Sequence, residues 1–196
     1  GMRRVAPSEG TLSMLKKLLV STALVAMTTA GASALTVSYE QFVPGPTLTD
    51  YASIGTVNGQ SLSLPQFDPA LGSLSGVQIL IDGSVLGSGD AENLDPAQGG
   101  DLTIRISAEL TATFAGSQSV TTIPLTDTTQ TVSAFDGTND GGGTSGFTIS
   151  DVTGSDNNLL NVPMAAWGPF IGTGNVGGSL SAVASSQILS TTGTTD

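Results

Sequence analysis

The sequence predicts an all-β fold, an antiparallel β-sandwich of jelly-roll or immunoglobulin-like type, present as a single domain after a signal peptide. Three observations support this prediction. Several segments alternate between apolar and polar residues, turn residues separate these segments, and no window beyond the N-terminal region has helical periodicity over three turns. Because no helices are expected that would cover a parallel sheet, the strands should pair into two packed antiparallel sheets.

The N-terminal region has the order of features that is typical of a secretory signal peptide. Lys16 and Lys17 are followed by the short apolar run LLVSTALVAM and then by small residues ending in Ala-Ser-Ala at 32–34, an A-x-A cleavage site. An apolar run of about ten residues is too short to cross about 30 Å of hydrocarbon as a helix. A buried N-terminal helix is the alternative interpretation of this run.

The signal peptide predicts an exported protein, and we expect no transmembrane anchor in the chain. Cleavage is expected near Leu35. The expected parts are a leader or expression-derived segment at 1–13, the signal peptide at 14–34 and the β-sandwich domain at 35–196.

The expected strands begin at the start of this domain. Residues 35–40 alternate with a period of two, which predicts a strand with one buried face. A second strand is expected at 77–81, where it leads into Asp82-Gly83, a dipeptide that predicts a hairpin turn. Shorter strands are expected at 120–125, 131–135 and 147–152.

The clearest strand is LTIRISAELTATFA at 102–115. Every even-numbered residue in it is apolar, and nearly every odd-numbered residue is polar. Since successive side chains of a strand point to opposite faces, this segment should bury one face and expose the other. The C-terminal segment 176–188 repeats the pattern, with its apolar residues mostly on one parity.

The composition excludes several kinds of chemistry. The chain has no cysteine and no histidine, and the expected mature domain has no lysine. A Ser-His-Asp triad, a cysteine nucleophile, an ordinary zinc site and a lysine Schiff base are therefore excluded. We expect that the protein is not an enzyme. A glycosidase that uses only carboxylates is the remaining enzymatic alternative, but nothing places two of Glu40, Glu92 and Glu109 across a cleft.

The charge of the mature domain argues against nucleic acid as a partner. Its formal charge is −14, because Arg105 is its single basic residue against fifteen carboxylates. Binding to nucleic acid or anionic lipid requires clustered lysine and arginine. Serine and threonine instead make up 42 of its residues, and threonine suits strands.

The loop FDGTNDGGGTSGF at 135–147 is the candidate metal site. Asp136 and Asp140 fall at positions 1 and 5 of an EF-hand-like loop, with Gly141 at position 6. Position 12, where such loops carry a bidentate glutamate, is Phe147. The glycines are also what a turn with positive φ requires. We expect a turn and no cofactor, and a calcium site is the alternative.

Two further motifs have a structural and a functional interpretation. Trp167 and Phe170, in AAWGPFIG, are candidates to stack on a sugar ring, but we expect them to fill the core at one end of the sandwich. The glycines of GTGNVG at 172–177 match a dinucleotide-binding pattern. A strand rather than a helix is expected after them, so we assign them to a turn.

Three segments together resemble the choice-of-anchor E family of exported bacterial proteins. They are SLSLPQFDPALGSLSGVQILIDGS at 61–84, FDGTNDGGGTSG at 135–146 and WGPFIGTGNV at 167–176. The resemblance implies an all-β extracellular domain without catalytic residues, often with a C-terminal sorting anchor of the PEP-CTERM type. This chain departs from the family there, since it has no Pro-Glu-Pro, apolar span or basic tail after Gln187.

The expected function is therefore passive. We expect a secreted or surface-associated bacterial protein with a structural or adhesive role in the cell envelope or exopolysaccharide matrix, with polysaccharide or other surface proteins as partners. The alternative is a carbohydrate-binding module, with or without calcium.

Overall fold

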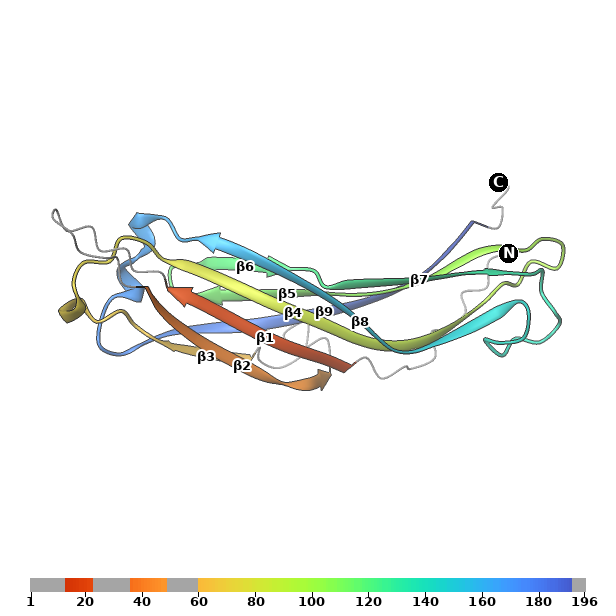
Figure 1. The fold of residues 1–196 in the computed structure, drawn as a ribbon, viewed down its shortest axis with the longest axis horizontal. Coiled ribbons are helices and arrows are strands. Elements are labelled where there is room, and N and C mark those ends of the chain that lie inside the picture. The colour runs from red at the N-terminus through yellow and green to blue at the C-terminus, as the bar shows by residue number, and fades with distance from the viewer. Residues whose placement is uncertain (1–12, 23–35, 49–59, 192–196) are drawn as a thin grey trace.

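The structure is a computed structural model that describes residues 13–22, 36–48 and 60–191, with the backbone alone for 13–22 and 44–48. It is an elongated body of two packed β-sheets whose strands run along the long axis (Figure 1). All the pairings between its named strands are antiparallel. The predicted all-β sandwich is therefore confirmed.

One sheet, called sheet A, has the strand order β2-β1-β4-β8. Strand β4 pairs with β8 along nearly its whole length, and β1 lies between β2 and β4. The bounds of its strands are β1 Ser13–Thr22, β2 Val37–Leu48, β4 Gln78–Glu92 and β8 Gly146–Asn161.

The second sheet, called sheet B, has the order β3-β9-β5-β6, and β7 also pairs with β5. Strands β6 and β7 divide one edge of β5 between them, while β9 covers its other edge. The bounds are β3 Gln60–Pro65, β5 Gly100–Phe114, β6 Gln118–Thr122, β7 Leu125–Val132 and β9 Asn175–Ser190, and the short 3-10 helices are η1 Pro69–Leu71, η2 Met164–Ala166 and η3 Gly168–Phe170.

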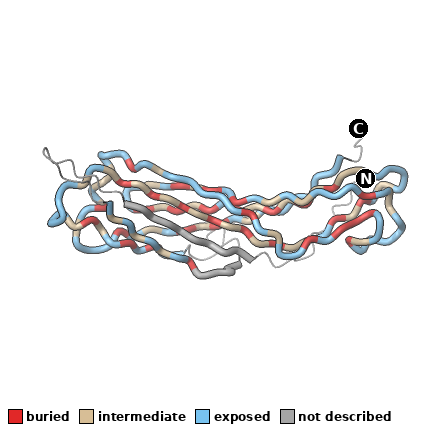
Figure 2. Tube along the Cα trace, viewed as in Figure 1, coloured by how far each residue is buried: buried red, intermediate tan, exposed pale blue. Residues whose placement is uncertain are grey.

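The core lies between the two sheets, and buried residues alternate with less buried ones along the strands (Figure 2). The even-numbered residues of β5 and the odd-numbered residues of β4 supply much of it, including Ile106 and Ile79, which are 1% and 0% exposed. Burying one such side chain contributes roughly 1.5–3 kcal/mol. The prediction for 102–115 is confirmed, because β5 has the expected buried parity.

The predicted hairpin at Asp82-Gly83 is wrong. Strand β4 continues through both residues to Glu92. Gly83 faces the other sheet, and a Cβ at this position would overlap Leu110 Cδ1 on β5. The glycine therefore permits a close approach of the two sheets, and packing overrides the local turn preference of Asp-Gly.

Other predicted strand limits also change. The segment 120–125 is not one strand, since β6 ends at Thr122 and β7 begins at Leu125. Pro124 has no N–H to donate and lies in the break. The strand expected at 131–135 is instead the end of β7, which stops at Val132, and β3 was not predicted.

The two sheets are joined at both sides by side chains. On one side, Asp156 of β8 accepts hydrogen bonds from Thr122 Oγ1 at 2.6 Å and from the N–H of Ile123 at 2.9 Å. On the other side, Gln41 of β2 donates to the carbonyl of Ser61 at 3.2 Å and accepts from the N–H of Ser63 at 2.7 Å. These bonds satisfy strand-edge groups that would otherwise have no sheet partner.

The segment predicted as the signal peptide includes β1. The described residues 13–22 form a strand, not the helix considered as the alternative, while the rest of the apolar run and the cleavage site at 32–34 lie outside the described residues. Whether it is cleaved stays a prediction. Within the described ranges, no helix is long and apolar enough to span a membrane.

Candidate binding face

The outer face of sheet B carries rows of hydroxyl groups that cross several strands. In the first row, the register places Ser61, Ser179, Thr113 and Ser119 side by side on β3, β9, β5 and β6. A second row, two residues along each strand, contains Ser181, Thr111 and Thr121. We call these seven residues the hydroxyl grid.

The grid has a regular geometry because it follows the sheet. Neighbouring strands lie about 4.8 Å apart, and residues two apart on a strand are separated by roughly 6.7 Å. Within the rows, Thr111 Oγ1 and Thr121 Oγ1 are 2.8 Å apart, and Thr113 Oγ1 and Ser119 Oγ are 2.9 Å apart. Such cross-strand threonine pairs stabilise a sheet. In each pair one hydroxyl donates to the other, so each pair still has one hydroxyl hydrogen that is not used within the pair.

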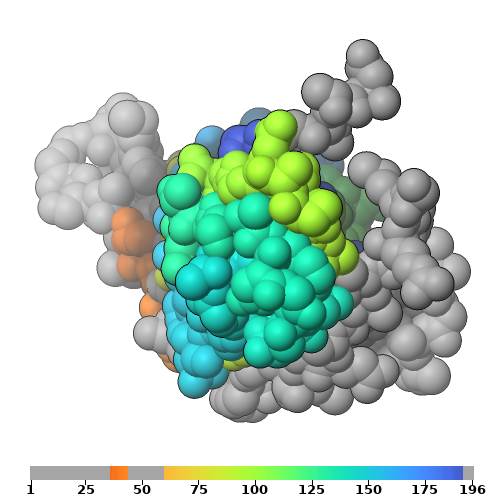
Figure 3. All heavy atoms as spheres, turned by 90° about the vertical axis from the view of Figure 1, so that its right-hand side faces the viewer, coloured from red at the N-terminus to blue at the C-terminus, as the bar shows by residue number. Residues whose placement is uncertain are grey.

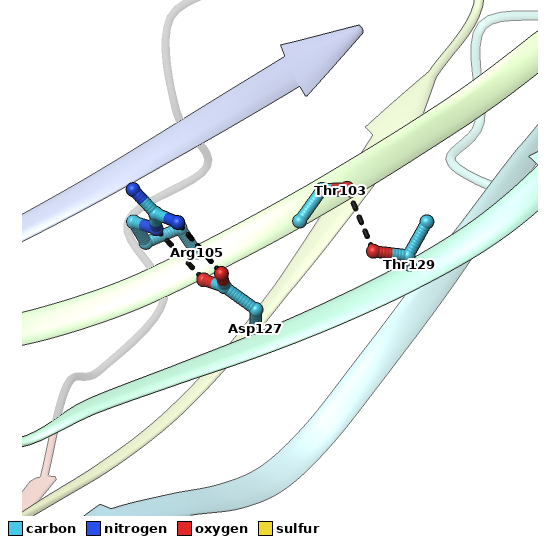
Figure 4. A network of polar contacts seen from close by, with 4 residues as sticks. All are labelled: Thr103, Arg105, Asp127 and Thr129. Carbon is cyan, nitrogen blue, oxygen red and sulfur yellow. Dashed lines mark hydrogen bonds and ion pairs between the residues drawn. The ribbon is translucent and has the colours of Figure 1, made fainter. Parts of the chain in front are cut away.

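The other half of the face pairs its polar groups in the same way. Thr103 of β5 and Thr129 of β7 share a hydrogen bond of 2.7 Å (Figure 4). Next to them, Arg105 donates from Nε and Nη2 to the two oxygens of Asp127, at 2.8 and 2.7 Å (Figure 4). Both side chains are about one-third exposed.

This ion pair has an electrostatic consequence for the face. The hydrogen bond from Arg105 holds the pKa of Asp127 below its usual value, and the same bond raises the pKa of Arg105. The single cation of the predicted mature domain is therefore already neutralised. Glu109, also on this outer face, is exposed, so the face carries hydroxyl groups, one neutralised ion pair and one exposed carboxylate.

The loop at 135–147 connects β7 of sheet B to β8 of sheet A, and its atoms cover much of one end of the molecule (Figure 3, teal). Gly137, Gly141 and Gly143 have φ values of 99°, 64° and 61°. These values lie in the left-handed region, where glycine has no steric penalty. The glycines therefore serve the turn conformation.

The two candidate carboxylates in this loop accept hydrogen bonds from loop amides. Asp136 accepts from the N–H of Thr138 at 3.0 Å and from that of Thr144 at 3.3 Å, and the bond from Thr138 is the largest cause of its lowered pKa. Asp140 accepts from the N–H of Gly142 at 3.0 Å. Both residues thus form Asx turns.

Glu92, at the end of β4, also supports the loop. Its carboxylate accepts hydrogen bonds from the N–H of Gly141 at 2.9 Å and from the hydroxyl of Ser145, which is fully buried. Sequence reasoning missed this role, because Glu92 lies more than forty residues away from both partners. In the described part of the chain, no three acidic side chains form a group that could hold a metal ion.

The two aromatic candidates lie at the opposite end of the strands. Phe170 is 3% exposed, and its ring centroid lies 6.4 Å from that of Phe114. Its face is therefore not available to a sugar. Trp167 is partly buried against the core and donates from Nε1 to the carbonyl of Val162 at 2.8 Å. Part of its surface remains exposed.

The glycines at 172–177 form the entry to β9. Gln66 donates to the carbonyl of Pro169 at 2.9 Å and accepts from the N–H of Gly174 at 3.0 Å, which ties this turn to the end of β3. The segment that follows Gly174 is strand β9 rather than a helix. This segment therefore does not form the helix N-terminus that binds the pyrophosphate in dinucleotide-binding proteins.

The fold defines the chain as an all-β protein of two packed antiparallel sheets. A scan against protein-family models finds no family that matches it, and a search of curated proteins finds no similar sequence. The resemblance to the choice-of-anchor E family stays a prediction from the three sequence segments.

Proposed function

We propose that this protein is a secreted or surface-associated bacterial protein with a structural or adhesive role in the cell envelope or the exopolysaccharide matrix. The observation that carries this proposal is the hydroxyl grid. Seven hydroxyl groups on four strands lie in two rows on the outer face of sheet B. Hydroxyl groups that both donate and accept suit a polymer whose surface is itself covered with hydroxyl groups.

The negative charge of the domain favours a neutral polysaccharide as the polymer that it binds. A formal charge of −14 repels uronate- or sulfate-containing chains, and Arg105 is engaged by Asp127. Each hydroxyl contact contributes little alone, so binding would depend on many contacts along one polymer chain and on many copies of the protein. This is the behaviour of a passive matrix component.

The second candidate is a carbohydrate-binding module that uses Trp167. The partial exposure of its ring supports this alternative, because stacking on a sugar ring requires an accessible aromatic face. Phe170 contributes no such face, since it is buried.

The two candidates are distinguished by a binding assay on insoluble and soluble neutral glucans. The grid variant Thr111→Val/Thr113→Val/Thr121→Val removes three hydroxyls with little change in shape, and the matched control Thr103→Val/Thr129→Val removes two from the other half of the same face. We expect the grid variant to lose most retention by the glucan and the control to keep it. Retention lost only in Trp167→Ala would support the binding module, and full retention by the grid variant would contradict the proposal.

A further inference from the structure

The strand β1 occupies a position that the predicted processing would vacate. It lies between β2 and β4 and pairs antiparallel with both (Figure 1). Its residues, Ser13–Thr22, fall almost entirely within the predicted signal peptide at 14–34. We call the position between β2 and β4 the β1 slot.

Removal of β1 would leave backbone groups of β4 without a sheet partner. The N–H of Val162 donates to the carbonyl of Val77 at 2.9 Å, which shows that these two opposed residues form a hydrogen-bonded pair. Odd-numbered residues of β4 therefore bond to β8, and even-numbered ones such as Asp82 and Leu86 direct their N–H and C=O groups toward β1. Unpaired strand edges of this kind bind further strands.

Strand β2 is not suited to fill the slot itself. Because β1 is antiparallel to both neighbours, β2 runs parallel to β4. It would have to form a parallel ladder in place of the antiparallel one, and it is tied to β3 by the two hydrogen bonds of Gln41. A separate strand of the opposite direction is needed.

We propose that, after the signal peptide is removed, the β1 slot binds an extended strand from a different protein, one that is apolar and carries one or two basic residues. This inference rests on the predicted cleavage and goes beyond polysaccharide binding. It is donor-strand addition, in which backbone hydrogen bonds supply affinity and alternate side chains supply specificity.

The chemistry of this partner follows from the segment that the slot accepts and from the charge around it. The sequence SMLKKLLVST is apolar with two lysines. In the register, position 17 lies opposite Asp82 of β4, and position 19 lies opposite Glu40 of β2. A second copy of the mature domain is a poorer donor, because it has no lysine and carries the same charge of −14.

The test uses the full chain exported by a bacterial host, with the processed form identified by its intact mass. A fluorescent peptide of sequence SMLKKLLVST is titrated into this protein and followed by fluorescence anisotropy. Two control peptides carry Lys17→Pro/Leu19→Pro, which removes ladder donors, or Lys17→Glu, which reverses the charge at the position opposite Asp82. We expect the first control to bind at least about tenfold more weakly and the second to lose affinity most strongly at low salt.

A pair of protein variants locates the binding position. Asp82→Lys reverses a charge beside the slot, and Glu109→Lys makes the same change on the outer face of sheet B. We expect weaker peptide binding only in Asp82→Lys, with the thermal unfolding of both variants measured to confirm folding. Glucan retention of the same preparation is recorded separately, so failure here is distinguishable from failure of the proposed function.

Three results would overturn the proposal. One is a processed protein that is folded by circular dichroism and does not bind the peptide. Another is an exported protein whose mass still includes 14–34, because the slot is then occupied. The third is a concentration-dependent dimer that excludes the peptide, because a second copy is then the occupant.

Discussion

The two sheets of this molecule differ in where their strands come from. All five strands of sheet B lie within the predicted mature domain, and its central strand β5 is paired on both edges. Sheet A has β1, from the predicted signal peptide, as one of its two inner strands. The comparison teaches that one half of a sandwich can be built entirely from the predicted mature domain while the other includes a strand from the predicted signal peptide.

The difference also separates the two proposed surfaces. The hydroxyl grid lies on sheet B and requires only strands of the mature domain. The β1 slot lies in sheet A, where β1 occupies it in the structure. The proposal requires that the predicted processing empties it. Perturbing one sheet at a time is therefore the way to test the comparison.

The largest effect is expected from truncating the core of the complete sheet. Ile106→Ala should lower the free energy of unfolding by about 2–5 kcal/mol, because Ile106 is 1% exposed and a cavity would remain. The neighbouring Ser107→Ala should change it by less than about 0.5 kcal/mol. Urea unfolding measures both.

The equivalent truncation in sheet A sharpens this comparison. Ile79→Ala removes a side chain that is 0% exposed on β4. In the processed protein, it should cost less than Ile106→Ala, because a sheet with a vacated strand relaxes more easily around the lost volume. An equal or larger cost would indicate that sheet A is as rigid as sheet B after processing.

An intermediate effect is expected where the two sheets approach most closely. Gly83→Ala should destabilise the protein by about 1–3 kcal/mol, because the added methyl group overlaps Leu110. Gly89→Ala is the matched control on the same strand, since the nearest atom to its added methyl group would be Ile104 Cγ2 at 4.0 Å. Similar thermal unfolding of both variants would contradict the close approach of β4 to β5.

A smaller, pH-dependent effect is expected at the side where β8 meets β6. The hydrogen bond from Thr122 is the largest cause of the lowered pKa of Asp156, and the N–H of Ile123 adds to it. A carboxyl group whose pKa is lower in the folded state stabilises the fold above its unfolded pKa of about 3.8 and loses this contribution as the pH falls through the folded value.

Asp156→Asn should therefore make the free energy of unfolding depend less on pH in the acid range. Unfolding measured between about pH 6 and pH 2 should show a smaller acid-dependent loss in the variant than in the parent protein. Asp127 and Asp136 also have lowered pKa values and remain in both proteins, so the difference reports Asp156 alone. Identical slopes would show that Asp156 has no stabilising partners.

The smallest effect is expected at the exposed ion pair on sheet B. Arg105→Gln should change the free energy of unfolding only slightly, because both partners are about one-third exposed and screened by solvent. The cost should decrease as salt is added. A large cost that is independent of salt would mean that Arg105 stabilises the sheet through its packing.

The strands that could be predicted were those whose burial has one clear parity. Strand β5 alternates along its whole length, so its sequence alone identifies the buried face. Strand β7 has mostly polar residues on both faces and forms because β5 offers its edge. The Asp-Gly pair in β4 shows the opposite error, in which a strong local signal is overridden by packing against Leu110.

The candidate site depends on information that is not local. The excess of serine and threonine was evident, but the rows require the register between strands distant in sequence, such as Ser61 beside Ser179. The loop could be predicted as a turn because glycines at positive φ have a local signature. Its support by Glu92 could not, since that contact arises only when β4 and β8 pair.

Amide hydrogen exchange on the processed protein tests the central claim most directly, namely that sheet B is complete while sheet A has a vacated strand. The account predicts slow exchange for the amides of β5 and fast exchange for those of Asp82 and Leu86, with protection restored by the SMLKKLLVST peptide. Slow exchange at Asp82 and Leu86 without the peptide, equal to that of β5, would contradict it.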